Sequence, residues 1–286
     1  LGKLLLINIF SALILLIFVP TIKRTGGALA LLIITLLGLL APYLENHSSS
    51  SGHHMLAIGL VLVHVLALSL WIGGLIALAL ITKEERKFAA GRFHSIALWS
   101  LLAVALSGVV NGWVRLGTIA NITSNYGAIL VAKTLLLALI FMVAFTFRAR
   151  QRNNFDDGVL SRQLGIEGVL FGITMVFAVV LSRIAPPEVS LTTPINPILG
   201  STMPQSPTFS RLLLGYEPNG FFLALLILAV ALYIKGVVLL TKRGDKWPVH
   251  RTIFFALGIS VADFAVNGGL GVYSHVAFSF HMVAHM

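Results

Sequence analysis

The sequence predicts an all-α protein, a polytopic transmembrane helix bundle of about eight spans followed by a truncated ninth. Hydrophobic residues make up 57% of its 286 residues and charged residues only 10%, and the mean hydropathy is +0.95. A soluble domain with one buried core does not have this composition. Apolar runs of about 20 residues, long enough to cross a hydrocarbon layer of about 30 Å, recur along the whole chain.

Each predicted span is an apolar run that is closed by charged residues, glycine or proline. The runs are approximately 3–19, 27–44, 54–81, 93–116, 127–147, 164–185, 219–241 and 251–267. A ninth run begins near Ala277 and reaches the last residue of the sequence. Because the sequence begins at Leu1 without a methionine and stops inside this run, we expect both ends to be cut from a longer protein.

Two loops of unusual composition set the expected domain boundaries. The segment 186–218 holds seven of the ten prolines, and we expect it not to pack as regular structure. A run of serines at 48–51 predicts a flexible outer loop. We therefore expect an N-terminal helix pair with its loop (1–53), a first membrane domain (54–187), a proline-rich extracytoplasmic linker (188–218) and a truncated second membrane domain (219–286).

Lysine and arginine gather in alternate loops, and this pattern predicts the orientation of the chain. Of the 20 such residues, 14 fall in the loops at 23–24, 83–92, 148–162 and 242–251. The positive-inside rule makes these loops cytoplasmic and the N-terminus extracytoplasmic. The net charge of +10 is thereby explained by membrane topology, so we expect the lipid bilayer and no nucleic acid as a partner.

The predicted orientation sorts the histidines unevenly. Two of the nine, His94 and His250, fall on the cytoplasmic side. The others fall outside or in the outer part of a span, and they are His47, His53, His54, His64, His275, His281 and His285. This imbalance favours a function at the outer side of the membrane.

The last six residues have the pattern of a metal site. His281 and His285 are four apart, as are Met282 and Met286, and residues four apart lie on one helix face. Imidazole and thioether ligands favour copper, Cu(I) more than Cu(II). The chain has no cysteine, so metal chemistry rests on other ligands, among which His275 is a further candidate.

The histidine pair also has two other interpretations, as haem ligands or as polar residues of a core. Haem iron is commonly held by histidines on opposite faces of the ring, whereas His281 and His285 point the same way. The shared direction therefore favours a small ion.

Three more histidines are candidates for receiving a metal. His64 lies within the third predicted span, where an ionisable group normally faces the bundle interior, but it could also be a neutral structural histidine bonded to a carbonyl. His53 and His54 could form a mobile capture site, or be ordinary loop histidines. Gly73 and Gly74 predict close helix packing.

Other polar residues within the predicted spans could form an ion path or an interhelical clasp. Asn111 is one of them. Lys133 and Glu167 lie near the ends of spans, where snorkelling to the membrane surface is the favoured explanation. Asp263, with Asn267 four residues later, could either approach the metal site or pair with a neighbouring helix.

The first membrane domain resembles the copper-resistance protein D (CopD) family. The likeness lies in His64, the string Trp71–Leu75, the segment Arg92–Ala97 and, later in the sequence, Gly108–Asn111 and Tyr126–Lys133. It extends over roughly 54–187.

The second membrane domain resembles the start of the CtaG family of cytochrome c oxidase assembly factors. The matching strings are Gly244–Val249, Gly268–Tyr273 and the terminal His281-Met282 with His285-Met286. Ala284 departs from the glutamine expected between the histidines, and Asp263 is more charged than the family pattern. The family's later helices lie beyond this sequence.

Together the resemblances imply a fusion that handles copper in the bacterial plasma membrane without enzymatic activity of its own. The first unit would move or bind copper at the outer face, and the second would deliver it to the oxidase. A cytochrome c oxidase subunit and an extracytoplasmic copper chaperone would be the protein partners. An alternative function is that of a haem-binding b-type electron-transfer protein, with His64 opposite His281. A third hypothesis is a structural subunit whose histidines only clasp helices.

Overall fold

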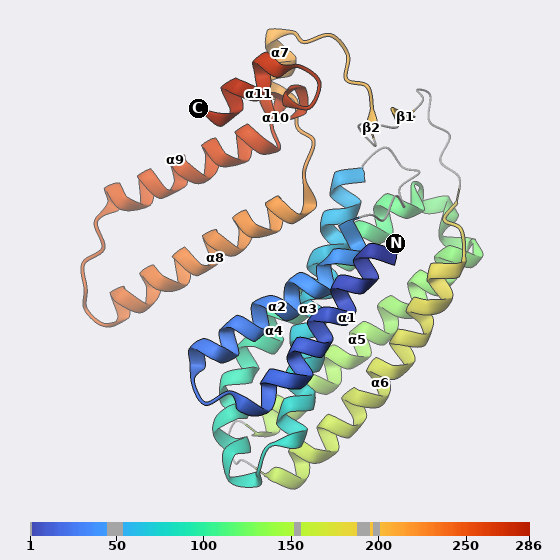
Figure 1. Ribbon diagram of the computed structural model, residues 1–286, viewed down its shortest axis with the longest axis vertical. Helices are drawn as coiled ribbons and strands as arrows, with labels where there is room; N and C mark the ends of the chain where they lie inside the picture. Colours follow the sequence, from blue (N-terminus) through green and yellow to red (C-terminus); the bar gives the residue numbers. More distant parts are fainter. Residues whose placement is uncertain (1, 45–53, 152–155, 188–194, 197–200) are drawn as a thin grey trace. The chain divides into compact units, whose positions relative to one another are not determined.

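The computed structural model describes residues 2–44, 54–151, 156–187, 195–196 and 201–286. It confirms an all-α membrane helix bundle (Figure 1). Six described helices are long and apolar enough to cross a membrane: α3 (His54–Leu80), α4 (Lys83–Leu116), α5 (Asn125–Gln151), α6 (Asp157–Arg183), α8 (Gly220–Lys242) and α9 (Val249–Val266). The first two predicted spans correspond to α1 (Gly2–Phe18) and α2 (Thr25–Leu44), and the apolar stretches in these regions are shorter, Leu6–Thr21 and Thr25–Leu39.

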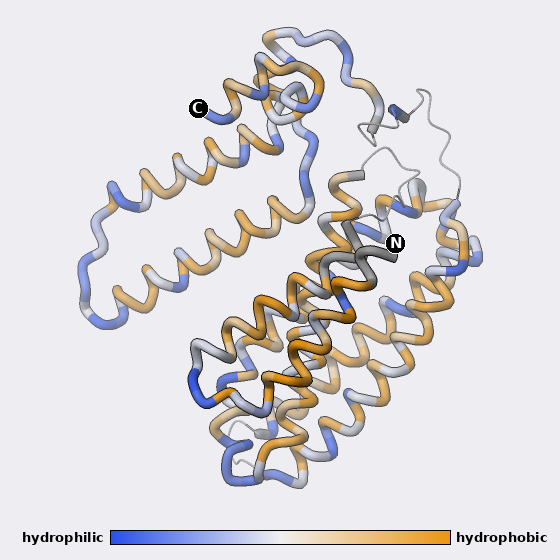
Figure 2. Tube along the Cα trace, in the orientation of Figure 1, coloured by the Kyte–Doolittle hydropathy of each residue, from blue (hydrophilic) through white to orange (hydrophobic). Residues whose placement is uncertain are grey.

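Apolar side chains cover the outside of the long helices. Figure 2 shows hydrophobic residues along their length and hydrophilic residues at their ends and in the loops. Leu80 and Phe254, for example, are 80% and 70% exposed. In a membrane such side chains face lipid, and the helices satisfy their own backbone hydrogen bonds, which is why this architecture suits the bilayer.

The chain divides into two compact units. Unit 1 consists of Leu1–Glu45 and Val61–Val189, and unit 2 consists of Asn46–Leu60 and Ser190–Met286. Each unit is described by itself below.

Unit 1 is built on α3 to α6. Trp71 is fully buried, and the edge of its ring meets Phe171 of α6 with ring centroids 4.8 Å apart. Gly74 of α3 lies directly against the ring of Phe93 in α4, so the predicted close packing is confirmed there, whereas Gly73 faces open space. The buried core cluster consists of Trp71, Leu75, Ala97, Leu101, Ile140 and Phe171.

A single arginine ties three helices together at one end of unit 1. From α4, Arg86 donates through Nη1 to Oδ1 of Asp157 (3.1 Å) and to Oγ of Ser161 (3.1 Å) in α6. Its Nη2 donates to the carbonyl oxygen of Ala79 in α3 (2.9 Å). A guanidinium fork can serve several acceptors at once, so this end of the bundle is held by charge-assisted bonds.

Unit 2 contains α8, α9 and three short helices, α7 (Phe209–Leu214), α10 (Gly269–Ser274) and α11 (Phe278–His285). The side chain of Asn219 caps α8 by accepting from the backbone N–H groups of Phe221 and Phe222. α11 begins one residue after Ala277, where the ninth run was expected to start.

The structure corrects two expectations about the helices and loops. The segment 186–218 is not wholly irregular, because α7 lies in it, capped by Thr208, and the two-residue strands β1 (Ile195–Asn196) and β2 (Ser201–Thr202) pair antiparallel. α4 begins at Lys83 rather than 93, because residues 83–92 are mostly good helix formers with Glu84 and Glu85 in the first turn. One-turn helices at Val19–Thr21 and Ile119–Thr123 complete the described secondary structure.

Candidate functional site

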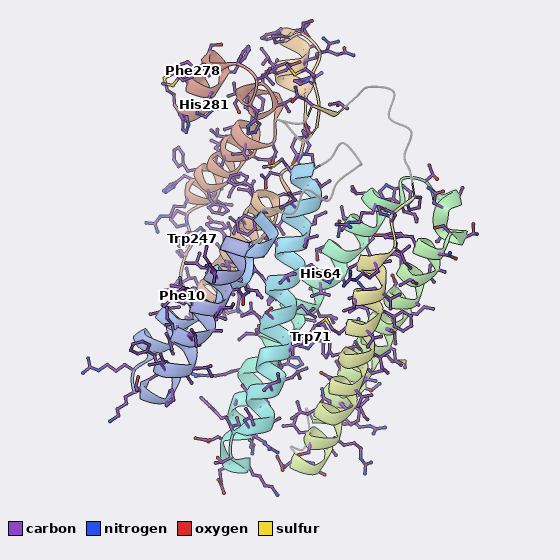
Figure 3. All side chains as sticks on the ribbon, turned by 45° about the vertical axis from the view of Figure 1, so that its right-hand side comes forward. Phe10, His64, Trp71, Trp247, Phe278 and His281 are labelled. Atoms are coloured by element: carbon purple, nitrogen blue, oxygen red, sulfur yellow. The ribbon has the colours of Figure 1, made fainter. Side chains whose placement is uncertain are left out.

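The two terminal histidines lie side by side on α11. Their Nε2 atoms are 3.1 Å apart, and their rings meet edge to face with centroids 4.6 Å apart. Phe278, one turn earlier, stacks against His281 at 6.4 Å (Figure 3). The two imidazoles and the Phe278 ring thus follow one another along one side of α11.

The separation of the two nitrogens suits adjacent corners of a metal site. Two ligands at 2.0–2.1 Å from a tetrahedral ion lie about 3.3 Å from each other. The Nε2 atoms of His281 and His285 are close to that distance already. A linear site, with the nitrogens on opposite sides of the ion, would require both rings to turn.

The neighbouring methionines leave their thioethers accessible. Met282 is 47% exposed and Met286 is 97% exposed, so both sulfur atoms are free to approach an ion. Within the described part of the chain, no group of three His, Cys, Asp or Glu side chains is placed to hold a metal. His275, exposed at the end of α10, therefore does not join the histidine pair in this arrangement.

The proposed capture site cannot be placed. His53 lies outside the described residues, as does His47. His54 is the first residue of α3, and its side chain is also outside the described part.

His64 faces the interior of unit 1 from α3, two turns from Trp71 on the same helix (Figure 3). Its Nδ1 lies 3.0 Å from Oγ of Ser107 in α4, and the carbonyl of Val104 also faces it. Ser107 is 2% exposed, so this is a buried contact between two helices. His64 belongs to unit 1 and the terminal pair to unit 2.

Glu167 is not explained by snorkelling. Glu167 is fully buried ten residues into α6, where its Oε1 accepts from Nε2 of Gln163 at 2.6 Å. The expectation for Glu167 is therefore wrong, because the side chain points into the core with Leu160, Gln163 and Phe171 along one stripe of α6. Lys133 is half-buried and interacts electrostatically with His64 and Arg115.

Asp263 contacts Asn267 and Tyr216 rather than the histidine pair. Its Oδ1 accepts from Nδ2 of Asn267 at 2.7 Å and from the hydroxyl of Tyr216 at 3.3 Å. Tyr216 also forms an antiparallel bridge with Gly268. These bonds join the segment before α8 to the end of α9.

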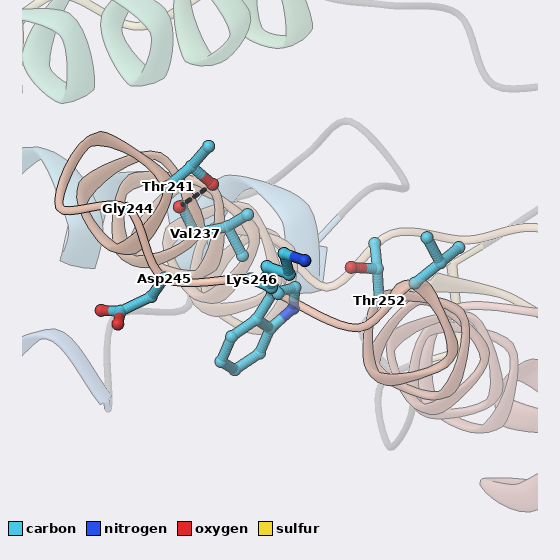
Figure 4. Close-up of a pocket in the computed structure, with 8 residues that line it drawn as sticks. Val237, Thr241, Gly244, Asp245, Lys246 and Thr252 are labelled. Atoms are coloured by element: carbon cyan, nitrogen blue, oxygen red, sulfur yellow. Dashed lines mark hydrogen bonds between the residues drawn. The ribbon is translucent and has the colours of Figure 1, made fainter.

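A separate open cavity of about 650 Å³ lies at the loop between α8 and α9 (Figure 4). Nε1 of Trp247 donates to the hydroxyl of Tyr233 at 2.8 Å, and that hydroxyl donates to Thr252 at 2.9 Å. Gly244 adopts a φ of +91°, which turns the chain back after α8. The lining residues are Val237, Thr241, Gly244, Asp245, Lys246, Trp247, Val249 and Thr252, which include no histidine or methionine.

Sequence reasoning missed three residues of these polar contacts, namely Ser107, Gln163 and Tyr216. Ser107 and Arg115 each lie four residues from Asn111. Polar residues at this spacing share one face of an apolar helix, so the sequence does contain a signal for Ser107. Gln163 has a similar signal, four residues before Glu167. Tyr216 offers none, because its partner Asp263 is 47 residues away.

Comparison with known families matches two segments of the chain. Residues 87–181 match the family described as Copper resistance protein D, and residues 231–286 match the Cytochrome c oxidase caa3 assembly factor family, Caa3_CtaG. Both resemblances read from the residues are thus confirmed, in one chain, as in a fusion of the two units. The first match begins after His64, and the second includes His281 and His285.

Curated relatives match only a short stretch. Over 88 residues the chain is 33% identical to uncharacterized proteins of Mycobacterium bovis and Mycobacterium tuberculosis, and 30% identical to one of Mycobacterium leprae. This stretch is 31% of the chain but only 13% of each relative, so the chain covers a small part of their length. No solved structure matches the chain.

Proposed function

We propose that this multi-pass membrane chain, which joins a copper-resistance segment to an oxidase-assembly segment, binds copper at the outer side of the bacterial plasma membrane and passes it on. The family matches relate the chain to copper resistance and to cytochrome c oxidase assembly in general. Copper is cargo in this proposal, and the chain carries out no catalytic turnover of its own.

The observation that carries the proposal is the His281–His285 pair. The two Nε2 atoms are already 3.1 Å apart, close to the separation of neighbouring ligands on one ion. The pair also lies inside the segment that matches the assembly-factor family. Exposed imidazoles at a short terminal helix can take up an ion and release it again without unfolding the bundle.

The oxidation state that we propose is Cu(I). Met282 and Met286 have accessible thioethers next to the pair, and soft sulfur ligands select Cu(I). A site with two neighbouring nitrogens and exposed sulfur ligands can exchange its ion with an acceptor that offers further ligands. An extracytoplasmic copper chaperone and a cytochrome c oxidase subunit would be the donor and the acceptor.

The test is copper stoichiometry in the purified chain. Replacing His281 and His285 together by alanine removes both nitrogens, and we expect copper per chain after Cu(I) loading to fall at least about tenfold, as loss of even an outer-shell partner can cost that much. Elemental analysis measures it. A visible spectrum of the same sample distinguishes copper from haem, because bound haem absorbs strongly there.

His250→Ala is the matched control, because His250 is also exposed in unit 2 but lies at the start of α9. This variant should keep the copper of the unaltered chain. Equal copper in the double variant and in the control would contradict the assignment.

A further inference from the structure

Basic side chains from two neighbouring helices, together with a histidine from a third, gather in unit 1. Lys133 of α5 is half-buried and lies within electrostatic range of Arg115 in α4 and of His64 in α3. Arg115 is in the last turn of α4, directly before the loop that leads to α5. The group therefore extends inward from one end of the bundle.

Neighbouring residues hold Arg115, which lies at one end of this group, in place. Ser107, Asn111 and Arg115 follow one another at intervals of four on one face of α4. Nε of Arg115 donates to Oδ1 of Asn111 at 3.3 Å, and the guanidinium also bonds to the hydroxyl of Tyr126. Tyr126 is only 4% exposed, so the arginine is held between α4 and α5 rather than extended into solvent.

Lys133 has one cationic neighbour, Arg115, and no carboxylate partner among the residues that the structure describes. Glu84 is 31 residues before Arg115, about 46 Å along α4 at 1.5 Å per residue. Asp157 lies at that same distant end and is bonded to Arg86, while Glu167 accepts from Gln163. These three acidic groups therefore either lie far from Lys133 or are bonded to other residues.

Two cations near one another and partly withdrawn from water are costly unless an opposite charge joins them. Arg115 and Tyr126 can each still offer a proton: a guanidinium has five N–H donors, and a tyrosine that accepts from Arg115 keeps its own O–H. Lys133 has three N–H donors. Donors of this kind, from two helices, match an oxyanion with several acceptor oxygens.

We propose that Arg115 and Lys133, with the Tyr126 hydroxyl, bind a phosphate-type oxyanion, supplied either by free phosphate or by the headgroup of an anionic phospholipid. The position at the end of α4 makes both sources accessible, because water and headgroups meet there. The proposal goes beyond copper handling and does not depend on it. A bare Cu(I) ion would be repelled at this place.

Two binding experiments on the intact chain distinguish the sources. In an uncharged detergent, radiolabelled inorganic phosphate is titrated in equilibrium dialysis. In nanodiscs of phosphatidylcholine with a minor fraction of phosphatidylglycerol, native mass spectrometry identifies the lipid that stays bound. We expect saturable binding in at least one experiment, with Lys133→Met weakening it about tenfold to a hundredfold, the range for one hydrogen bond to a charged group.

Three further variants make the result specific. Lys133→Arg keeps the charge and should bind, whereas Lys133→Gln keeps polarity without charge and should not. Lys235→Met is the control, because Lys235 is also within a predicted span but in α8. Binding of phosphate alone identifies a free anion, and binding of phosphatidylglycerol alone identifies a lipid. No binding in either experiment, or binding by folded Lys133→Met and Lys133→Gln that equals binding by the unaltered chain, would overturn the proposal.

Discussion

Asn267 is fully buried and joins the end of α9 to the segment before α8 through its side chain and its backbone. Its Nδ2 donates to Asp263, and its Oδ1 accepts from the backbone N–H of Asn219 at 2.8 Å. Its backbone carbonyl oxygen accepts from the backbone N–H of Glu217 at 2.8 Å. A buried amide that uses both of its ends in this way orients the chain around it. Asp263 thereby has a structural role beside Tyr216.

The Tyr216 hydroxyl gives unit 2 a sensitivity to alkaline pH. Partial burial and the nearby Asp263 carboxylate raise the pKa of Tyr216 above its usual value. Its stabilising contribution is therefore fully present below about pH 10, the pKa of an unfolded tyrosine, and is lost as the pH rises through the folded-state pKa. As the pH is raised from about 8 to 11, the melting temperature of Tyr216→Phe should therefore fall less than that of the unaltered chain.

Thermal unfolding followed by circular dichroism measures this difference. Tyr233→Phe is the control, because the Tyr233 hydroxyl bonds only to neutral partners, Trp247 and Thr252. If Tyr216→Phe and Tyr233→Phe respond equally to alkaline pH, the contact with Asp263 is not the cause.

At the residue scale, spacing predicted local pairs well and distant pairs poorly. The side-by-side arrangement of His281 and His285 follows from their separation by four, and the structure has it. The partners of His64 and Asp263 include Ser107 and Tyr216, which are 43 and 47 residues away. Such contacts depend on which helices are neighbours, and hydropathy does not determine that.

The contact between α3 and α4 depends on one of two adjacent glycines. A Cβ on Gly74 would collide with the ring of Phe93, whereas a Cβ on Gly73 would meet nothing within 4 Å. Gly74→Ala should therefore lower the stability of unit 1 by about 1–3 kcal/mol, the usual cost of overpacking. Gly73→Ala should be neutral or slightly stabilising, because alanine is the better helix former.

This pair of variants contains its own control, since the two changes add the same methyl group to the same helix. Unfolding in a denaturing detergent, with the loss of helical circular dichroism as the signal, compares them. A Gly73→Ala variant that is less stable than Gly74→Ala would contradict the packing described here.

At the element scale, helix type and order were predictable and helix ends were not. Long apolar runs predicted α3 to α6, α8 and α9, because a helix of about 20 apolar residues satisfies its own backbone hydrogen bonds in lipid. The start of α4 was missed since residues 83–92 are polar yet good helix formers. α7 was not predicted, because the high proline content of 186–218 favoured irregular structure and the N-cap at Thr208 is only a local signal.

The membrane orientation of the whole molecule stays a prediction of the positive-inside rule, and the chain is well suited to testing it. It has no cysteine, so a single introduced cysteine is a unique label. Thr82→Cys lies between α3 and α4, and Thr118→Cys between α4 and α5. A membrane-impermeant thiol reagent added to intact cells should label position 118 and not position 82.

Cells opened before labelling supply the control, because both cysteines should then react. Labelling of position 82 in intact cells, with position 118 protected, would invert the orientation and place the His281–His285 pair on the cytoplasmic side. Copper delivery outside the cytoplasm would then lose its geometric basis.

At the scale of the molecule, the sequence predicted the membrane class and both family resemblances, because each rests on composition or on local strings. The division into two units was not predictable in its details. The start of α3, up to Leu60, groups with unit 2, although hydropathy treats α3 as one continuous span. Which part of a helix packs with which unit depends on contacts between segments far apart in the sequence.

The length of α4 has a consequence for depth in the membrane. Arg92 and Arg115 enclose 22 residues without any Lys, Arg, Asp or Glu, about 33 Å of helix, which nearly equals the hydrocarbon thickness of about 30 Å. Sliding α4 by one turn in either direction would draw a guanidinium into the lipid tails, at about 2.5–3.5 kcal/mol if it reached the centre. α4 is therefore anchored vertically at both ends, and Ser107, the partner of His64, is kept at one level of the bilayer.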